Sequence, residues 1–330
     1  MNPAKCKAED YIQWLIATPK IATCTQAALS APTWVAHDAY TRLLERLEPE
    51  SDALWEEVCS LVLPRSGWLI LDDTTLDKPY ARRMELVCKH WSGKHQEVVN
   101  GINLLTLVWT DGDRAIPVDW RVFDKGHDGK TKNDHLRQML ETARQRGFAP
   151  KCMLWDSWYS SLENLKMLHA WGWPFFVGLK SNRLADPDGE GNRPLCALTF
   201  QEAHLHAHLK GLGWVELYRV CEPDKKTSRY FAGSEHLLTE EELQQRRESA
   251  NQIEQYHRGL KQYCHAERCQ ARSRRKQKNH IALSIRTFVR FSLHHFLSGV
   301  SPFEVKQTIQ REAIRLYRSL PFCELPKATA

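Results

Sequence analysis

The sequence predicts an α/β protein in which a mixed sheet is flanked by helices, preceded by a helical segment and interrupted by a β-rich insertion. Two short apolar runs carry this prediction. Residues 68–71 (Trp-Leu-Ile-Leu) lead directly into Asp72, and residues 152–155 (Cys-Met-Leu-Trp) lead into Asp156. Such runs are typical of buried strands with apolar side chains on both faces. The segments around them alternate between strand and helix periodicity, which indicates a sheet covered by helices.

The composition is that of an ordinary globular protein. The 330 residues are 42% hydrophobic and 26% charged, and no apolar run approaches the roughly 18 residues of a membrane helix. The N-terminus lacks the apolar core of a signal peptide. Ten scattered cysteines fit reduced thiols better than a disulfide framework. We therefore expect a cytoplasmic protein without a membrane partner.

Residues 1–63 predict a helical domain. Residues 10–16 are rich in apolar side chains, and residues 38–47 place Tyr40, Leu43, Leu44 and Leu47 at helical spacing. Between them, residues 25–30 predict a short helix capped by Thr25. A short helix, a turn and a second helix are compatible with a helix-turn-helix DNA reader, so this domain is a candidate DNA-binding domain.

Residues 64–180 predict the first part of a catalytic core. After the first strand, residues 98–109 and 115–123 are rich in strand formers and are separated by the hairpin turn Thr-Asp-Gly-Asp. A helix at 132–147, the strand ending at Asp156, a helix at 161–171 and a strand at 175–180 follow. Three antiparallel strands, then helix, strand, helix and strand, are the order of an RNase H-like core.

The second half of the chain predicts three further segments. Residues 181–235 read as a β-rich insertion with strands at 213–220 and 228–232. Residues 236–300 complete the core, with a helix that starts near Thr239 and carries Glu254. Residues 301–330 predict a C-terminal helix and a frayed tail.

Three carboxylates in this order predict a metal site. Asp72 closes the first strand, Asp156 the fourth, and Glu254 lies on the later helix. Hard divalent ions such as Mg²⁺ take oxygen ligands and keep water and phosphate oxygens in the rest of their shell. Two such ions activate the attacking hydroxyl and stabilise the leaving oxygen of an in-line phosphoryl transfer. In this interpretation Asp72 bridges the ions, and Asp156 and Glu254 each hold one side.

Basic residues concentrate after Glu254. Between positions 258 and 290 there are ten lysines and arginines and one acid, Glu267, which indicates either a phosphate-binding surface or a solvated face. Trp158 either stacks on a displaced base or packs in the core. His90 and Lys94 either contact phosphate or face water. The candidate DNA contacts are Arg258, Lys261, Arg272, Arg274, Arg275 and Trp158.

At these positions the sequence resembles the DDE transposases of bacterial insertion sequences, in the group with a β-rich insertion between the second Asp and the Glu. The resemblance covers about residues 65–300. The residues that carry it are Leu71-Asp72-Asp73-Thr74, Leu154-Trp155-Asp156-Ser157-Trp158-Tyr159, Ile253-Glu254-Gln255-Tyr256-His257-Arg258-Gly259-Leu260-Lys261, Glu267-Arg268-Cys269-Gln270-Ala271-Arg272 and Asn279-His280-Ile281.

The resemblance implies Mg²⁺-dependent nicking at the ends of the element, followed by attack of the freed 3′-hydroxyl on target DNA. It implies two Mg²⁺ ions, for which Mn²⁺ can substitute, with Asp72 rather than Asp73 as the first ligand. Lys261 corresponds to the family's phosphate-contacting lysine. Expected partners are the terminal inverted repeats, target DNA and a second copy when bound to DNA, in a bacterial, nucleoid-associated setting.

The cleavage route stays open at this point. Relatives that cut through hairpins carry a Tyr and an Arg seven and four residues before the Glu, and here those positions are Arg247 and Ala250. The sequence therefore does not predict the hairpin route.

Other readings remain. An RNase H-like nuclease would cut DNA without joining it, and an inactive regulator would bind DNA without cutting. The set Cys264, His265, Cys269 and His280 suggests zinc, although its spacing matches no common zinc finger. The sequence contains no GxGxxG, GxSxG or GxxxxGK[ST] motif that would support an unrelated hydrolase or dehydrogenase.

Overall fold

A computed structural model describes residues 5–20, 22–93, 96–222 and 227–323. Lys94 and residues 324–330 of the predicted tail lie outside these described residues. The chain divides into two compact units, and each is described by itself. Unit 1 comprises residues 1–49, 82–85 and 258–330; unit 2 comprises residues 50–81 and 86–257. The predicted N-terminal domain of residues 1–63 is therefore divided, because its first 49 residues group with the C-terminal helices and the rest with the sheet.

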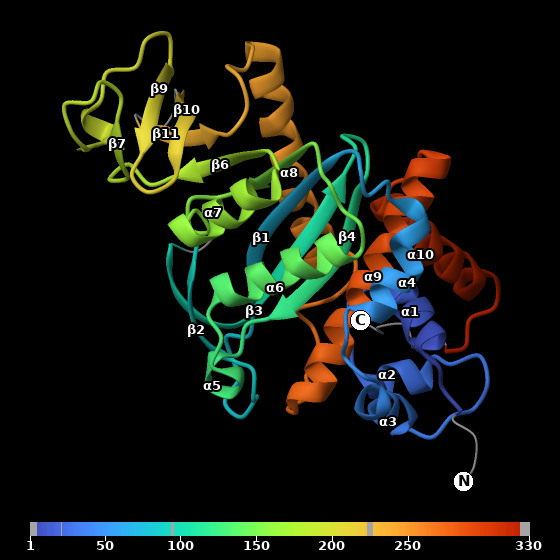
Figure 1. The fold of residues 1–330 in the computed structure, drawn as a ribbon. Helices are drawn as coiled ribbons and strands as arrows, with labels where there is room; N and C mark the ends of the chain where they lie inside the picture. Colours follow the sequence, from blue (N-terminus) through green and yellow to red (C-terminus); the bar gives the residue numbers. More distant parts are fainter. Residues whose placement is uncertain (1–4, 21, 94–95, 223–226, 324–330) are drawn as a thin grey trace, which may run out of the picture. The chain divides into compact units, whose positions relative to one another are not determined.

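Unit 2 is built on one mixed sheet, to which every strand of the described residues belongs (Figure 1). The predicted strands are present, together with short strands that the sequence did not reveal. The strands are β1 (Trp68–Asp77), β2 (Cys88–Ser92), β3 (Glu97–Thr110), β4 (Ala115–Val122), β5 (Cys152–Trp155), β6 (Phe175–Leu179), β7 (Leu184–Asp186), β8 (Arg193–Pro194), β9 (His204–Leu209), β10 (Gly213–Glu222) and β11 (Thr227–Gly233).

The order of the strands confirms the predicted core. Along the sheet it is β2-β3-β1-β5-β6-β11-β10-β9-β7-β8, with β4 paired to β3. β1, β3 and β4 are antiparallel neighbours, whereas β5 runs parallel to both β1 and β6. The strand pattern is that of three antiparallel strands followed by two parallel ones, as the alternation of strands and helices predicted.

β1 is longer than predicted, which corrects the expected place of Asp72. The strand was expected to close at Asp72, but it continues to Asp77 because its pairing with β3 continues as far as Asp77 opposite Gly101. The pairing with β5 does end early, at Leu71 opposite Trp155. Asp72 therefore lies inside a strand, immediately beyond the point at which its parallel neighbour stops.

The β-rich insertion extends the core sheet. β11 pairs antiparallel with β6, placing Phe231 opposite Gly178, and β10, β9, β7 and β8 follow outward. Phe176 and Phe231 stack with ring centroids 5.0 Å apart. The insertion is thus hydrogen-bonded to the strand next to β5, which ties it to the segment that carries Asp156.

Helices cover this sheet, with α6 (Lys132–Gln145) and α7 (Leu162–Trp171) lying over one face in Figure 1. Both begin at capping residues, since Thr131 accepts from the backbone N–H of Asp134 and Ser161 from that of Asn164. Leu136, Met139, Leu140, Leu165 and Leu168 are buried. The remaining helices of this unit are α4 (Asp52–Val58), the 3₁₀ turns η1 (Cys59–Leu61) and η2 (Leu195–Ala197), α5 (Lys125–Asp128) and the larger part of α8 (Glu240–Gln262).

Unit 1 is helical. It contains α1 (Ala8–Ala17), α2 (Cys24–Leu29), α3 (Ala39–Arg46), α9 (Arg274–Ser298) and α10 (Pro302–Ser319), along with the last residues of α8. One correction concerns α2, because the side chain that caps it is Thr23 instead of the predicted Thr25. The core of this unit joins α1, α2, α3 and α9, and includes Tyr11, Ile12, Leu15, Tyr40, Leu43, Leu44 and Leu283.

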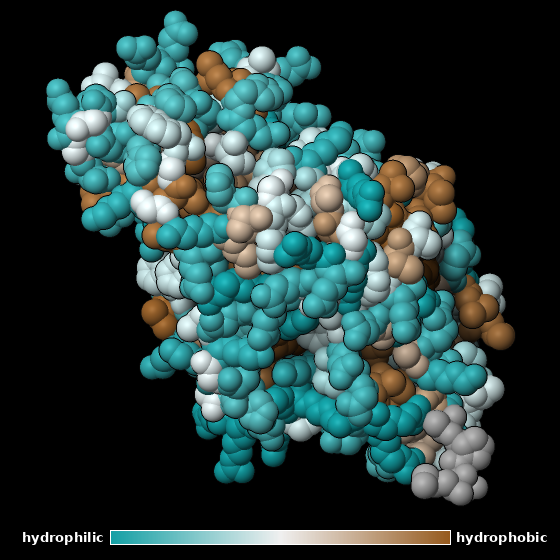
Figure 2. Space-filling view, in the orientation of Figure 1, coloured by the Kyte–Doolittle hydropathy of each residue, from teal (hydrophilic) through white to brown (hydrophobic). Residues whose placement is uncertain are grey.

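The chemical character of the described residues matches the composition. The face drawn in Figure 2 is largely hydrophilic, with scattered hydrophobic groups. Among the described residues, no helix combines the length and the apolar character that crossing a membrane requires. All ten cysteines carry free thiols, and Cys6, Cys152, Cys264 and Cys269 are buried.

Candidate active site

Asp72 and Asp156 each follow the last paired residue of two adjacent strands, Asp72 within β1 and Asp156 directly after β5. In the parallel pair of β1 and β5, Leu71 is opposite Trp155. The next residue in each of the two segments is one of the two aspartates. Neighbouring strands are about 4.8 Å apart, which brings the two carboxylates into the same small region. Asp156 is held in its turn by the backbone N–H of Trp158, which donates to Oδ1 at 2.9 Å. Two motifs 84 positions apart in the sequence thus approach each other, as expected for adjacent strands of an RNase H-like core.

α8 supplies the third carboxylate on the side of the sheet that Asp72 faces. Nδ1 of His257 is 4.0 Å from Oδ2 of Asp72, and His257 lies one helical turn after Glu254. The hydroxyls of Tyr256 and Thr106 are 3.4 Å apart, and Thr106 is the β3 residue opposite Asp72. These contacts fix this stretch of α8 beside Asp72, with the Glu254 side chain exposed to solvent.

The three carboxylates form a region of negative charge. Enclosure by protein raises the pKa of Asp72 well above its usual range, and the charges of Asp73, Asp156 and Glu254 raise it further. The pKa of Asp156 is also raised, first by partial removal from water and then by the charge of Asp73. Mutual repulsion of this kind is what a bound cation relieves.

Asp73 has a different role from its neighbour. Because successive side chains of a strand point to opposite faces, it projects away from Asp72, toward the start of α6 and the loop after β5. There it accepts from Nζ of Lys132 at 2.8 Å, from Nδ2 of Asn103 at 2.5 Å and from the hydroxyl of Tyr159. Although burial opposes ionisation, Lys132 and these hydrogen bonds lower the pKa of Asp73.

The contrast supports Asp72 as the reactive residue of the pair. The carboxylate of Asp73 is paired with Lys132, and its oxygens already accept hydrogen bonds from side chains of the protein. Among the described residues, the ion pair found for Asp72 is the longer one with the His257 ring at 4.0 Å. Sequence reasoning missed the partners Lys132, Asn103 and Tyr159. Only Tyr159 lay inside a motif that the sequence made visible.

The donor set suits hard divalent cations. Carboxylate oxygens are the ligands that Mg²⁺ prefers, and Asp72, Asp156 and Glu254 supply them from three elements. Within the described parts of the chain, no three His, Cys, Asp or Glu side chains are already gathered closely enough to hold a metal ion. The three carboxylates therefore fit Mg²⁺ by the chemistry of their oxygens, although the described side chains are not gathered around one ion position.

Trp158 is exposed beside the carboxylates and does not pack in the core. Its side chain is 57% exposed, and Nζ of Lys180 and Nζ of Lys132 lie 5.2 Å and 5.9 Å from its ring centroid. Cations over an indole face are attracted to its π electrons. The open ring and its two ammonium groups form a surface suited to the bases and phosphates of DNA.

The candidate basic contacts of unit 1 are of two kinds. Three are engaged by acids of the same unit: Arg275 pairs with Glu48, Arg274 is 3.9 Å from Glu85, and Lys261 is 3.3 Å from Glu267. Arg258 and Arg272 are exposed to solvent. In contrast, the ion pairs of Arg275, Arg274 and Lys261 also stabilise the unit.

The zinc reading finds no support in the structure. Cys264, His265, Cys269 and His280 are all buried in unit 1, and burial raises the pKa of the Cys264 thiol. The ring of His280 instead hydrogen-bonds the hydroxyl of Tyr11 at 2.9 Å and the carbonyl of His265 at 2.9 Å. His90, a candidate phosphate contact, is also buried, with its ring 3.1 Å from Sγ of Cys88. These groups have structural roles.

Comparisons with known proteins identify the family of this chain. A family described as DDE superfamily endonuclease matches residues 2–194, which include Asp72 and Asp156 and end before Glu254. A solved structure, the piggyBac transposase synaptic complex with hairpin DNA, is similar in fold with a TM-score of 0.51 at 12% identity. The similarity covers 98% of this chain and 76% of that one. A comparison with curated proteins found no match. Because the family match spans more than half of the sequence, the chain belongs to the DDE superfamily of endonucleases.

Proposed function

We propose that this protein is a transposase that cleaves DNA at the ends of an insertion sequence and joins the freed 3′-hydroxyl to target DNA. The observation that carries the proposal is the register of β1 and β5, in which Asp72 and Asp156 each follow the last paired residue; the charges of Asp156 and Glu254 also act on Asp72. The match to the endonuclease superfamily supports the cleavage chemistry. The similar fold of a transposase supports the wider assignment.

Asp72, Asp156 and Glu254 are the proposed ligands of two Mg²⁺ ions. Such ions supply charge neutralisation at the scissile phosphate and acidify the attacking hydroxyl. The chain's own contribution is position: β1 and β5 hold two carboxylates on a rigid sheet, and α8 offers the third from one side. Lys132 pairs with Asp73, so that Asp72 is the member of the Asp72–Asp73 pair proposed to bind a cation.

DNA contacts follow from the exposed basic and aromatic side chains. Arg258, Arg272 and Trp158 are exposed, and Lys261 contributes a further positive charge on α8. The ion-paired Arg274 and Arg275 would have to exchange Glu85 and Glu48 for phosphate, so they rank below Arg258 as contacts. The helical part formed by α1 to α3 is the proposed reader of the terminal repeats, and two copies pair the two ends.

The proposal is tested with DNA from either side of the coding sequence as donor, a supercoiled plasmid as target, and Mg²⁺. A transposase produces joined donor–target strands. Asp72→Asn, Asp156→Asn and Glu254→Gln should remove both nicking and joining. Glu248→Gln is the matched control, because Glu248 is an exposed acid of the same helix bonded to Gln244.

Each other product pattern contradicts a defined part of the proposal. Nicked DNA without joined strands indicates a nuclease of this fold. Bound but intact DNA indicates a regulator that has lost activity. Nicking that persists in all three carboxylate variants would place the active site elsewhere.

A further inference from the structure

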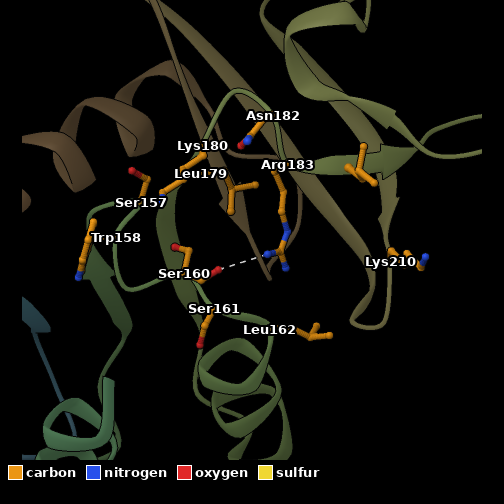
Figure 3. Close-up of a pocket in the computed structure, with 11 residues that line it drawn as sticks. Ser157, Trp158, Ser160, Ser161, Leu162, Leu179, Lys180, Asn182, Arg183 and Lys210 are labelled. Carbon is orange, nitrogen blue, oxygen red and sulfur yellow. Dashed lines mark hydrogen bonds between the residues drawn. The ribbon is translucent and has the colours of Figure 1, made fainter. Parts of the chain in front are cut away.

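A pocket lies next to Asp156, between the loop after β5 and the first turn of the insertion (Figure 3). Its volume is about 480 Å³. The wall on one side is formed by Ser157 and Trp158 and by residues 160–162, which follow Asp156 closely in the sequence. The other wall comes from residues 179–180, residues 182–184 and Lys210. All of these residues belong to unit 2, so the pocket and the carboxylates share one compact body.

The pocket is positively charged. Lys180, Arg183 and Lys210 line it, and no acidic residue does. Arg183 is half-buried, and burial lowers its pKa. In the described part of the chain, the one contact of its guanidinium is the 3.5 Å approach of Nη1 to the carbonyl of Ser160. A half-buried guanidinium that lines a pocket without acidic residues can bind a phosphate through two parallel hydrogen bonds.

The size of the pocket limits the ligand. A volume of about 480 Å³ is within the range of small-ligand sites and suits one nucleotide, whereas a duplex is far too wide to enter. Leu162, Leu179 and Leu184 give part of the lining an apolar character, and the exposed Trp158 ring also lines the pocket. A phosphate with an attached sugar and base matches this combination of cations and apolar surface.

We propose that this pocket, called here the Arg183 pocket, binds a phosphate-bearing nucleotide of a single DNA strand beside the carboxylates. The inference rests on the proposed function, since it assigns a place to one part of the DNA substrate. Arg183 receives the phosphate, with Lys180 and Lys210 at its rim. A strand in this position is separated from its complement immediately next to Asp156, so the pocket would favour DNA that is frayed or single-stranded at the cleavage point.

The test measures DNA binding without divalent cations, so that no cleavage is needed. The probes are a fluorescent 12-nucleotide single strand and the blunt duplex of the same sequence. Arg183→Gln should weaken single-strand binding about 10-fold and reduce the slope of log K against log salt by about 0.7, the value for one lost phosphate contact. Duplex binding should change less than about twofold.

Two further variants separate binding from folding. Lys210→Gln alters an exposed side chain of the pocket and should weaken single-strand binding without lowering the melting temperature. Lys166→Gln, an exposed lysine on α7 outside the pocket, is the matched control and should leave binding unchanged. Equal effects of Arg183→Gln and Lys166→Gln, or an equal loss for single strand and duplex, would overturn the inference.

A competition experiment distinguishes a strand from a free nucleotide. If dAMP displaces the oligonucleotide at the oligonucleotide's own dissociation constant, the pocket is a mononucleotide site and the proposed strand contact is wrong. Weak competition, more than about 100-fold above that constant, agrees with a contact to one unit of a longer strand. Cleavage by the unaltered protein with Mg²⁺ is measured separately, so a failure of the proposed function is read independently of the Arg183 pocket.

Discussion

Replacing Lys132 by methionine should destabilise the protein by leaving the Asp73 carboxylate without its cation. Nζ of Lys132 is 2.8 Å from Oδ2 of Asp73, and the two side chains are 19% and 18% exposed. Removing one partner of a buried ion pair costs about 3–5 kcal/mol. Because both groups keep some solvent and Asn103 and Tyr159 still donate to Asp73, we expect about 2–3 kcal/mol.

A double-mutant cycle tests whether the unpaired Asp73 carboxylate is the cause of the lost stability. With Lys132 replaced, Asp73→Asn removes an uncompensated negative charge near Asp72 and Asp156, so the double variant should be more stable than Lys132→Met alone by about 1–2 kcal/mol. The assay is urea unfolding followed by circular dichroism, with Lys166→Met as the control lysine. A Lys132→Met variant within about 0.5 kcal/mol of the unaltered protein would refute the reasoning that Asp73 is a structural carboxylate.

Three further outcomes are expected. A Cβ at Gly178 would lie 2.8 Å from the backbone N of Ser157, so Gly178→Ala should displace the Asp156 loop and reduce DNA cleavage, measured as nicking at equal folded fraction. Burial lowers the pKa of Lys306 to about 8; since the unfolded chain keeps this proton up to about pH 10.5, stability should rise between pH 8 and 10.5 in urea titrations, and Lys306→Met should lack this rise. Arg258→Gln should weaken DNA binding more than Arg275→Gln, because Glu48 occupies Arg275; equal losses by fluorescence anisotropy would contradict this.

Local sequence patterns were sufficient for most of the core. The apolar run at residues 152–155 is β5, and Gly147 follows α6 with a φ of +84°, because both signals depend on residues within a few positions. The full length of β1 could not be read, since Asp72 and the polar residues after it are paired with β3, which lies some 30 positions further along the chain. β2 is a short edge strand in a polar stretch, which hides its pattern.

The sequence predicted the part of the candidate site in which short motifs end on carboxylates. It did not predict the part in which side chains that are distant in the sequence come together. The similar form of the two runs placed Asp72 next to Asp156. The preference for Asp72 over Asp73 followed from the resemblance to the transposase family, and the partners of Asp73 could not be predicted: Lys132 and Asn103 lie 59 and 30 positions from Asp73. The sequence left the basic segment open between a phosphate-binding surface and a solvated face, and it could not predict the ion pairs of the segment, because acids such as Glu48 that pair with it are more than 200 positions away.

Binding of Mn²⁺ to the folded protein, followed by electron paramagnetic resonance, tests the central claim that Asp72, Asp156 and Glu254 are the metal ligands. Mn²⁺ takes the same oxygen ligands as Mg²⁺ and is observed directly, without DNA or turnover. Asp72→Asn should weaken Mn²⁺ binding at least about 10-fold, the effect of losing a charged ligand, whereas Asp73→Asn should bind Mn²⁺ nearly as well as the unaltered protein. Loss of binding in Asp73→Asn with retention in Asp72→Asn would contradict the account.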